Sequence, residues 1–480
     1  MVLNFTQPRT MFFAEFMLFS SINSRFNSIF FIEVGLSTAE IGIILAIYSI
    51  FAIFAGPFWT LLADKMNNAA LILAVCSTGA TISFLSYSLA TQFFHFLIVR
   101  SAFSMFFPPI SSLMDAIGFN TFESNSISLA AKQAAYGKER LWGAVSWAIT
   151  HILIGFLMDA FHVASTVLYT FSIVSLLFFV AIVLWTRTLR HGQTKLSTVE
   201  EDGFELHTAA VADTVLFESQ VSDADTAAVS INTDEDMGSE NRCDEQVLIG
   251  GTSSQARGWV AIKNILCKDA RSIVFFLDVT VLGMGTSLVE GLVFVFFVND
   301  LNASNSLCGI SVLITVLFEI PIFYYSDHVV EYFSNRTLMG IAHVAYVVRV
   351  VGYTVIPNPW WLLMLEVSTK KKKRFPLTST LKTNQFVASP LLKPLHGVTY
   401  ACFQLSSVAI ASHLAPGHLQ STAQGLRSAF LNFGAAVGYI FGGYIMQYYE
   451  SNTLYRSMAG IVFVALLLYI SSAFCLKPAK

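Results

Sequence analysis

The stretch IGIILAIYSIFAIFAGPFWTLLADK, residues 41–65, carries no charged side chain before Asp64 and Lys65. An α-helix rises about 1.5 Å per residue, so about 20 residues of this kind cross the roughly 30 Å hydrocarbon core of a bilayer. We therefore place a membrane span at about 40–62. Lipid cannot satisfy open backbone groups and the run is too long for a barrel strand, so this span is expected to be a helix.

Similar apolar segments recur in two sets of six, separated by a polar stretch. The candidate spans are roughly 10–34, 40–62, 69–90, 92–117, 140–160 and 165–186, then 271–298, 305–326, 336–356, a broken segment from Trp360 to His413, 425–449 and 454–475. This layout predicts an all-α polytopic membrane protein with about 12 transmembrane helices in two six-helix bundles, at 1–187 and 269–480. It is typical of solute carriers.

The composition supports a membrane location and argues against an enzyme. Hydrophobic residues make up 55% of the 480 residues and charged residues 12%, and the mean hydropathy is +0.62. A soluble domain carries about a quarter charged residues. The six cysteines have no metal-ligand spacing, and the chain has no Walker loop and no nucleophile elbow. We expect no catalytic residues, no metal, no cofactor and no nucleic-acid partner.

Charges along the chain predict its orientation. Basic residues fall in alternate connections, with Arg456 as the exception, and by the positive-inside rule this places both termini and the central stretch in the cytoplasm. That stretch, 188–268, is rich in Asp and Glu and is predicted to be a disordered tether, although a regulatory role remains an alternative. The sequon Asn302-Ala-Ser304 then lies on the outer side.

The two halves also share residue patterns at equivalent positions, which favours duplication of a six-helix unit. At the end of the second span of each half a proline is followed by an aspartate, as Pro57 and Asp64 and as Pro321 and Asp327. In the fifth span of each half an arginine is followed fifteen residues later by a glycine, as Arg140 and Gly155 and as Arg427 and Gly442.

Several short motifs resemble those of a known family. The segment from Thr60 to Lys65, TLLADK, resembles the loop signature Gly-x-Leu-Ala-Asp-Arg/Lys of the major facilitator superfamily, with Thr60 in place of the glycine and no basic tail after Lys65. Segments 136–143, 319–321, 394–400 and 422–426 resemble the associated-domain branch, near the lactose-permease-like and nucleoside–proton symporter groups. The resemblance implies the major facilitator fold, alternating access, and gating residues that we expect to include Asp64, Lys65 and Arg140.

Ionisable residues inside the predicted spans are the candidate site. A charge at the bilayer centre costs about 2.5–3.5 kcal/mol, so such residues are retained for pairing or for function. They are Glu15, Arg25, Arg100, Asp115, Asp278, Glu290, Glu319, Arg349, Glu366 and His396. Asp115 and Asp278 lie near span ends, and we expect them to be solvated or to pair helices. His151 is expected to form an interhelical hydrogen bond.

Five of these residues are candidates for proton coupling in the C-terminal bundle: Glu290, Glu319, Arg349, Glu366 and His396. A carboxyl group beside an arginine can exchange a proton as substrate enters, and the lactose-permease resemblance implies this role for carboxylates and a histidine. Arg25 and Arg100 are candidates for substrate binding in the N-terminal bundle. The alternative is that all of these are static ion pairs that hold helices together.

The tenth span is interrupted by Val367–Lys393, which contains Lys370, Lys371, Lys372, Lys373 and Arg374. Without these residues Glu366 and His396 would lie on one face of an ordinary span. We interpret the segment as an anomalous insert, from a retained intron or a gene-model error. A genuine outward loop between two half-helices is the alternative.

The sequence thus predicts a monomeric, proton-coupled carrier of a small polar solute, of the sugar or nucleoside class. Two alternatives remain open at this point. One is an uncoupled facilitator or exporter with the same fold. The other is a non-transporting membrane receptor or scaffold that signals through the acidic tether.

Overall fold

The structure, a computed structural model, describes residues 8–66, 68–120, 129–184, 270–355, 395–414 and 420–475. One unit is formed by Met1–Val183 together with Val260–Lys480, and a second by Leu184–Trp259. The second unit lies outside the described residues except for Leu184. The predicted tether and the insert at 367–393 also fall outside them, and both remain predictions.

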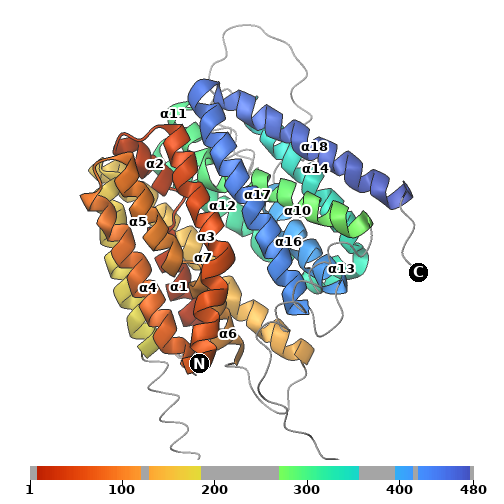
Figure 1. Ribbon diagram of the computed structural model, residues 1–480, viewed down its shortest axis with the longest axis horizontal. Coiled ribbons are helices and arrows are strands. Elements are labelled where there is room, and N and C mark those ends of the chain that lie inside the picture. The colour runs from red at the N-terminus through yellow and green to blue at the C-terminus, as the bar shows by residue number, and fades with distance from the viewer. Residues whose placement is uncertain are drawn as a thin grey trace, which may run out of the picture. The chain divides into compact units, whose positions relative to one another are not determined.

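The described part of the N-terminal half is built of helices that follow the apolar runs (Figure 1). They are α1 (Pro8–Ile22), α2 (Asn27–Glu33), α3 (Thr38–Met66), α4 (Ala69–Leu85) with the 3-10 turn η1 (Ser86–Leu89), α5 (Phe93–Phe106), α6 (Pro109–Asn120), α7 (Leu129–Phe161) and a helix at Ala164–Leu184.

The described part of the C-terminal half repeats this arrangement. Its helices are α10 (Ala270–Gly291), α11 (Val293–Asn299), α12 (Asn305–Tyr324), α13 (Ser326–Tyr332), α14 (Asn335–Tyr353), α16 (Leu395–Leu414), α17 (Gln420–Tyr448) and α18 (Ser451–Cys475).

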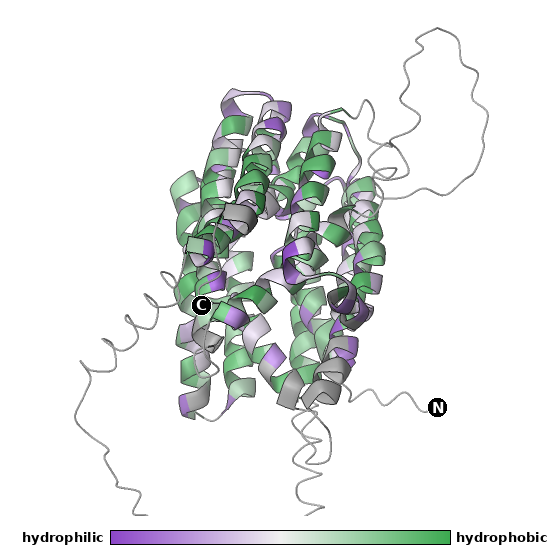
Figure 2. Ribbon diagram, turned by 90° about the vertical axis from the view of Figure 1, so that its right-hand side faces the viewer, coloured by the Kyte–Doolittle hydropathy of each residue, from purple (hydrophilic) through white to green (hydrophobic). Residues whose placement is uncertain are grey.

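Nine of the described helices are long and apolar enough to cross a membrane. They occupy Thr38–Ala63, Ala69–Leu89, Phe93–Asp115, Lys138–Phe161, Ala164–Leu184, Ala270–Gly291, Asn305–Tyr324, Ala423–Tyr448 and Ser451–Ser472. Together with α1–α2, α14 and α16 they fill the twelve predicted positions. Apolar residues run along most of the long helices (Figure 2), and many large ones, such as Leu61, Leu177 and Leu468, are exposed, as lipid contact requires. The predicted fold class is confirmed.

The first span is broken, whereas the sequence pattern predicted one continuous helix. Residues 23–26 leave the helical path between α1 and α2. The Ser24 hydroxyl accepts a hydrogen bond from the Phe26 N–H, and the Asn27 side chain donates to the Ile22 carbonyl. These short polar side chains replace the lost helical bonds, which makes the break tolerable inside a membrane.

The seventh span is broken as well, at Leu292 between α10 and α11. It directly follows Gly291, a residue that weakens a helix and here allows the Tyr439 ring to approach closely. The first span of each half is therefore a broken helix, and α2 packs against α11.

The two halves meet along two helix pairs, and the internal repeat relates one pair to the other. In the first pair, α3 packs against α17 (Figure 1), and glycines bring the two backbones into contact. A Cβ on Gly42 would collide with the Tyr439 carbonyl, and one on Gly443 would collide with the Thr38 carbonyl.

The second pair, α7 against α12, repeats this geometry residue for residue. A Cβ on Gly309 would collide with the His151 carbonyl, and one on Gly155 with the Asn305 carbonyl. Thr38 and Gly42 have the same spacing as Asn305 and Gly309, and Tyr439 and Gly443 have the same spacing as His151 and Gly155. The predicted duplication therefore extends to the contact between the halves. We call the end of the helices at which Thr38 contacts Gly443 and Asn305 contacts Gly155 the joined end.

Candidate functional site

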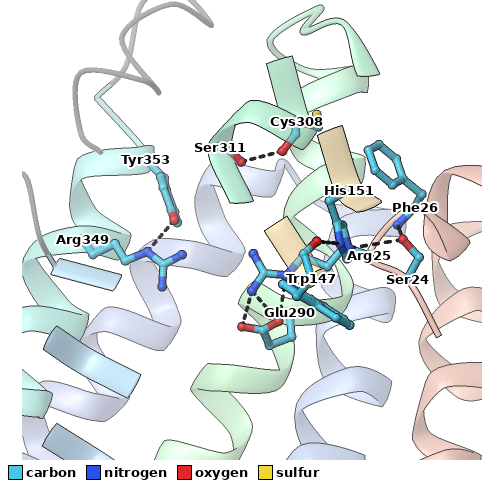
Figure 3. A network of polar contacts seen from close by, with 10 residues as sticks. All are labelled: Ser24, Arg25, Phe26, Trp147, His151, Glu290, Cys308, Ser311, Arg349 and Tyr353. Atoms are coloured by element: carbon cyan, nitrogen blue, oxygen red, sulfur yellow. Dashed lines mark hydrogen bonds and ion pairs between the residues drawn. The ribbon is translucent and has the colours of Figure 1, made fainter. Parts of the chain in front are cut away.

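An ion pair between Arg25 and Glu290 lies where the two broken helices meet (Figure 3). Arg25 occupies the break between α1 and α2, and Glu290 occupies the last turn of α10. The guanidinium donates from Nε to Oε2 at 2.8 Å and from Nη2 to Oε1 at 2.6 Å. This two-pronged geometry is the strong form of an arginine–carboxylate contact. It connects the N-terminal half directly to the C-terminal half.

The pair is buried on one side and accessible on the other. The Arg25 side chain is 8% exposed and the Glu290 side chain 37% exposed. Removing both charges from water would cost several kcal/mol, and the attraction between the two charges offsets this cost only in part even with good geometry. Because the Glu290 carboxylate is partly accessible, it keeps part of its solvation.

The backbone around Arg25 is held by a hydrogen-bonded chain that crosses to α7 (Figure 3). His151 Nδ1 lies 2.9 Å from the Trp147 carbonyl, which can only accept, so Nδ1 donates. Nε2 of a neutral His151 then accepts from the Ser24 hydroxyl at 3.4 Å. Phe26 stacks on the His151 ring at a centroid distance of 5.8 Å. The predicted interhelical role of His151 is confirmed.

Arg349 lies near this pair but does not bond to Glu290. It is 6% exposed, and its Nε donates to the Tyr353 hydroxyl at 2.5 Å. Glu290 and Arg349 line a common internal cavity of about 10 Å³, together with Thr286, Val289, Tyr346, Thr399 and Tyr400. This volume is near the lower limit for one water molecule. The structure thus brings two of the predicted coupling residues to one cavity.

Glu319 completes the described part of the predicted cluster. It lies on α12, where Gly397 of α16 packs against the Phe318–Glu319 backbone. Its carboxyl group is within electrostatic range of Glu290, Arg25 and Arg140. Glu366 lies outside the described residues, and so does the His396 side chain, so their predicted proximity stays a prediction.

Arg100, the other predicted substrate-binding cation, is 1% exposed in the N-terminal half. Its guanidinium lies 5.3 Å from the centre of the Tyr48 ring and 4.9 Å from that of Phe103. Nη2 donates to Asn23 Oδ1, in the break of the first span, at 3.4 Å. Nε and Nη1 have no hydrogen-bond partner of standard geometry among the described residues. Aromatic faces stabilise the cation and leave part of its donor capacity unused.

The predicted gating residues separate in the structure. Lys65 is exposed in the last turn of α3, and the Asp64 side chain lies outside the described residues. Arg140 lies within helix α7, with Nε 3.5 Å from Asp115 Oδ1 of α6. It therefore lies on a helix and not in a loop, its side chain is 45% exposed, and its gating role stays a prediction.

A second pair, Asp278 and His343, was missed as a pair by sequence reasoning. The sequence pattern named Asp278 alone, as solvated or helix-pairing, and the structure supports only helix pairing. Asp278 Oδ1 of α10 lies 2.7 Å from His343 Nε2 of α14, and both side chains are at most 2% exposed. The available signal was an ionisable residue within a span. Its partner, 65 residues away, required the tertiary structure.

Comparison with known proteins identifies the family. The MFS_1 like family model matches residues 9–369, and the Major Facilitator Superfamily model matches residues 385–479. The chain belongs to the major facilitator superfamily. It is a transporter of the MFS_1 like family, and the resemblance inferred from its motifs is confirmed. The two matches leave residues 370–384 uncovered, within the predicted insert.

Individual relatives are distant. The maltose permease of Geobacillus stearothermophilus is 22% identical over 443 residues, which cover 92% of this chain and 87% of that protein. The uncharacterized transporter YwbF of Bacillus subtilis (strain 168) is 30% identical over 124 residues, only 26% of this chain and 29% of its own length.

Solved structures support the fold. The crystal structure of the nucleoside transporter NupG matches with a TM-score of 0.68 at 16% identity, covering 99% of this chain and 100% of that chain. A POT family transporter in complex with a thioalcohol-conjugated peptide matches with a TM-score of 0.62 at 9% identity, covering 98% of this chain and 96% of that chain. The MFS_1 like chain is thus an integral, multi-pass membrane protein with the major facilitator fold.

Proposed function

We propose that this MFS_1 like transporter is a proton-coupled symporter of a small polar solute, of the nucleoside or sugar class, and that it works as a monomer. The observation that carries the proposal is the partly accessible Arg25–Glu290 pair, which joins the two halves. The names of two relatives, a nucleoside transporter and a maltose permease, support the solute class.

The chemistry of coupling follows from the pair. While Glu290 is ionised, Arg25 holds it with two charge-assisted hydrogen bonds, and the halves stay joined. A proton on Glu290 removes the charge that Arg25 binds, and the freed guanidinium can donate to solute hydroxyl groups. Proton and solute therefore weaken the same contact, which couples their movement to the separation of the halves.

Two observations support an orientation with the joined end outside. The sequon Asn302-Ala-Ser304 lies between α11 and α12 at that end. Lys65, Lys138 and Arg140 lie toward the opposite ends of α3 and α7. We propose that both termini and the acidic linker face the cytoplasm and that the central site is reached from there in this conformation.

Uptake by the purified full chain in proteoliposomes tests the function. We expect uridine or maltose to accumulate when the outside is acidic and merely to equilibrate at equal pH. Uptake that is identical under both conditions would indicate a facilitator, and no uptake of either probe would overturn the solute class.

A further inference from the structure

A cavity of about 550 Å³ lies between α14, α16 and α18, away from the Arg25–Glu290 pair, and the proposed cycle does not use it. We call it the α14 cavity, because α14 packs against both other helices and supplies much of the wall (Figure 1). Its size is that of a site for a small molecule. Most of the side chains that line it are aliphatic, among them Ile341, Val344 and Leu466.

The α14 cavity lies on the side of α14 that faces lipid. Gly340 and Val344 line it, and Val348 continues the same helical face four residues further on. Val344 and Val348 are exposed, as is Ile470, which lines the cavity from α18, whereas Tyr346 on another face of α14 is buried. Exposed aliphatic side chains on a membrane-spanning helix contact acyl chains. The bilayer itself is therefore the source of whatever fills this cavity.

One end of the α14 cavity carries a positive charge. Arg336 and Thr337, in the first turn of α14, line this end, and the Arg336 guanidinium lies 5.9 Å from the centre of the Tyr469 ring. Among the described residues no carboxylate forms an ion pair with Arg336, and no acidic side chain lines the cavity. A phosphate would meet a cation here, whereas the ammonium of choline or ethanolamine would meet no carboxylate.

The length of the α14 cavity matches one leaflet. Val344 follows Arg336 by eight residues, or roughly 12 Å along the helix, and half of the hydrocarbon core is about 15 Å thick. Because α12 begins at the joined end, α14 begins at the opposite end, which is the cytoplasmic end in the proposed orientation. Anionic lipids are enriched in the cytoplasmic leaflet, and basic pockets between helices on that side bind their head groups.

We propose that the α14 cavity binds one glycerophospholipid with a net negative head group, whose phosphate contacts Arg336 and one acyl chain of which lies along Gly340 and Val344. The lipid also covers Tyr469, whose ring stacks on that of His343 at a centroid distance of 6.0 Å. It thereby shields the buried Asp278–His343 pair from the bilayer. The site depends neither on the transported solute nor on proton coupling, and only the assignment to a leaflet uses the proposed orientation.

Native mass spectrometry of the delipidated full chain, titrated with dioleoyl-phosphatidylglycerol or dioleoyl-phosphatidylcholine, tests the charge at this site. We expect the wild type to retain one phosphatidylglycerol more tightly than phosphatidylcholine. Arg336→Gln should weaken phosphatidylglycerol binding about fivefold, the effect of one arginine at an anionic membrane surface, and leave phosphatidylcholine binding unchanged. Arg456→Gln, at an exposed position of α18 near the joined end, is the matched control and should change neither. Equal retention of the two lipids by the wild type would overturn the proposal.

Filling the α14 cavity tests its place in the fold. A Cβ on Gly340 meets no atom of the described residues within 4 Å outside its own helix backbone, so Gly340→Leu should occupy the cavity without a clash and abolish retention of phosphatidylglycerol. Gly460→Leu is the matched control, since its Cβ position is equally open and it does not line the cavity. Val344→Trp blocks the cavity from an exposed position if Gly340→Leu does not fold.

Thermal unfolding gives a second measurement of the same site. A ligand that binds only the folded chain raises its melting temperature, so phosphatidylglycerol should stabilise the wild type and Gly460→Leu and have no such effect on Gly340→Leu or Val344→Trp. Retention and stabilisation that persist unchanged in either cavity-filling variant would overturn the proposal.

Discussion

Asp159 of α7 caps the N-terminus of α12 in the opposite half: its two carboxylate oxygens accept hydrogen bonds from the N–H groups of Asn305 and Ser306, at 2.9 and 2.7 Å. The repeat supplies an equivalent contact, because Gln447 Oε1 of α17 accepts from the N–H and the hydroxyl of Thr38 on α3. Each half therefore closes the joined end by capping a helix of the other.

Removing one cap should loosen the joined end. Asp159→Ala leaves two helix N–H groups without their charged acceptor, and we expect a loss of about 2 kcal/mol for the closed arrangement, roughly a thirtyfold shift in population. Distances between spin labels at Phe161 and Asp300, both exposed at this end, would report the separation. Gln447→Ala removes only a neutral acceptor and should shift the distances less. Identical distributions in wild type and Asp159→Ala would contradict this role.

Bulk at the interface glycines should have a larger effect than loss of a cap. In Gly309→Leu the new side chain meets the His151 carbonyl, a backbone atom that cannot move aside, so the helices α7 and α12 must separate. We expect the same spin labels to move apart and uptake to stop. Gly460→Leu on α18 is the matched control, because no atom of the described residues outside its own helix backbone lies within 4 Å of its Cβ position. Equal loss of uptake in both variants would point to a folding defect instead.

The Asp278–His343 pair should contribute to stability more than an exposed histidine does. His343→Ala leaves a buried carboxyl group without its partner, a change that costs about 3–5 kcal/mol when the group stays charged. Thermal unfolding of the detergent-purified chain would measure the loss, with His328→Ala, at an exposed position of α13, as control. Equal melting temperatures for the two variants would show that the pair has no stabilising role.

The insert should impair the carrier that contains it. Inserting five neighbouring cations into the bilayer within one span costs a free energy of over roughly 10 kcal/mol on insertion scales. Deletion of residues 367–393 should therefore increase both the amount of folded protein and solute uptake. Deletion of 27 residues from the acidic stretch, 205–231, is the control of equal length and should leave uptake unchanged. A fall in uptake after removal of 367–393 would favour a genuine loop.

The sequence predicted what the bilayer dictates and missed what depends on tertiary contacts. Long apolar runs such as Ala164–Leu184 have one stable form in lipid, so helices and fold class followed directly. The break at 23–26 was missed because apolar residues flank it on both sides. Its cause is local but subtle: the Ser24 and Asn27 side chains replace backbone hydrogen bonds.

The candidate site was predicted by residue but not by pairing. Burial of charge in a span identified Arg25 and Glu290 individually. Their partnership joins positions 265 residues apart and depends on two helix breaks that meet, so no spacing rule could reveal it. Arg349 was expected to pair with a carboxylate and instead donates to Tyr353, its neighbour one helical turn away.

Proton movement during solute entry tests the central claim most directly. The full chain is reconstituted into proteoliposomes containing a pH-sensitive dye, and uridine or maltose is added outside at equal pH. The account predicts that the lumen acidifies as solute enters. Glu290→Gln should abolish this acidification, because an amide at position 290 cannot take up or release a proton. Solute entry without any change of internal pH in the wild type would contradict it.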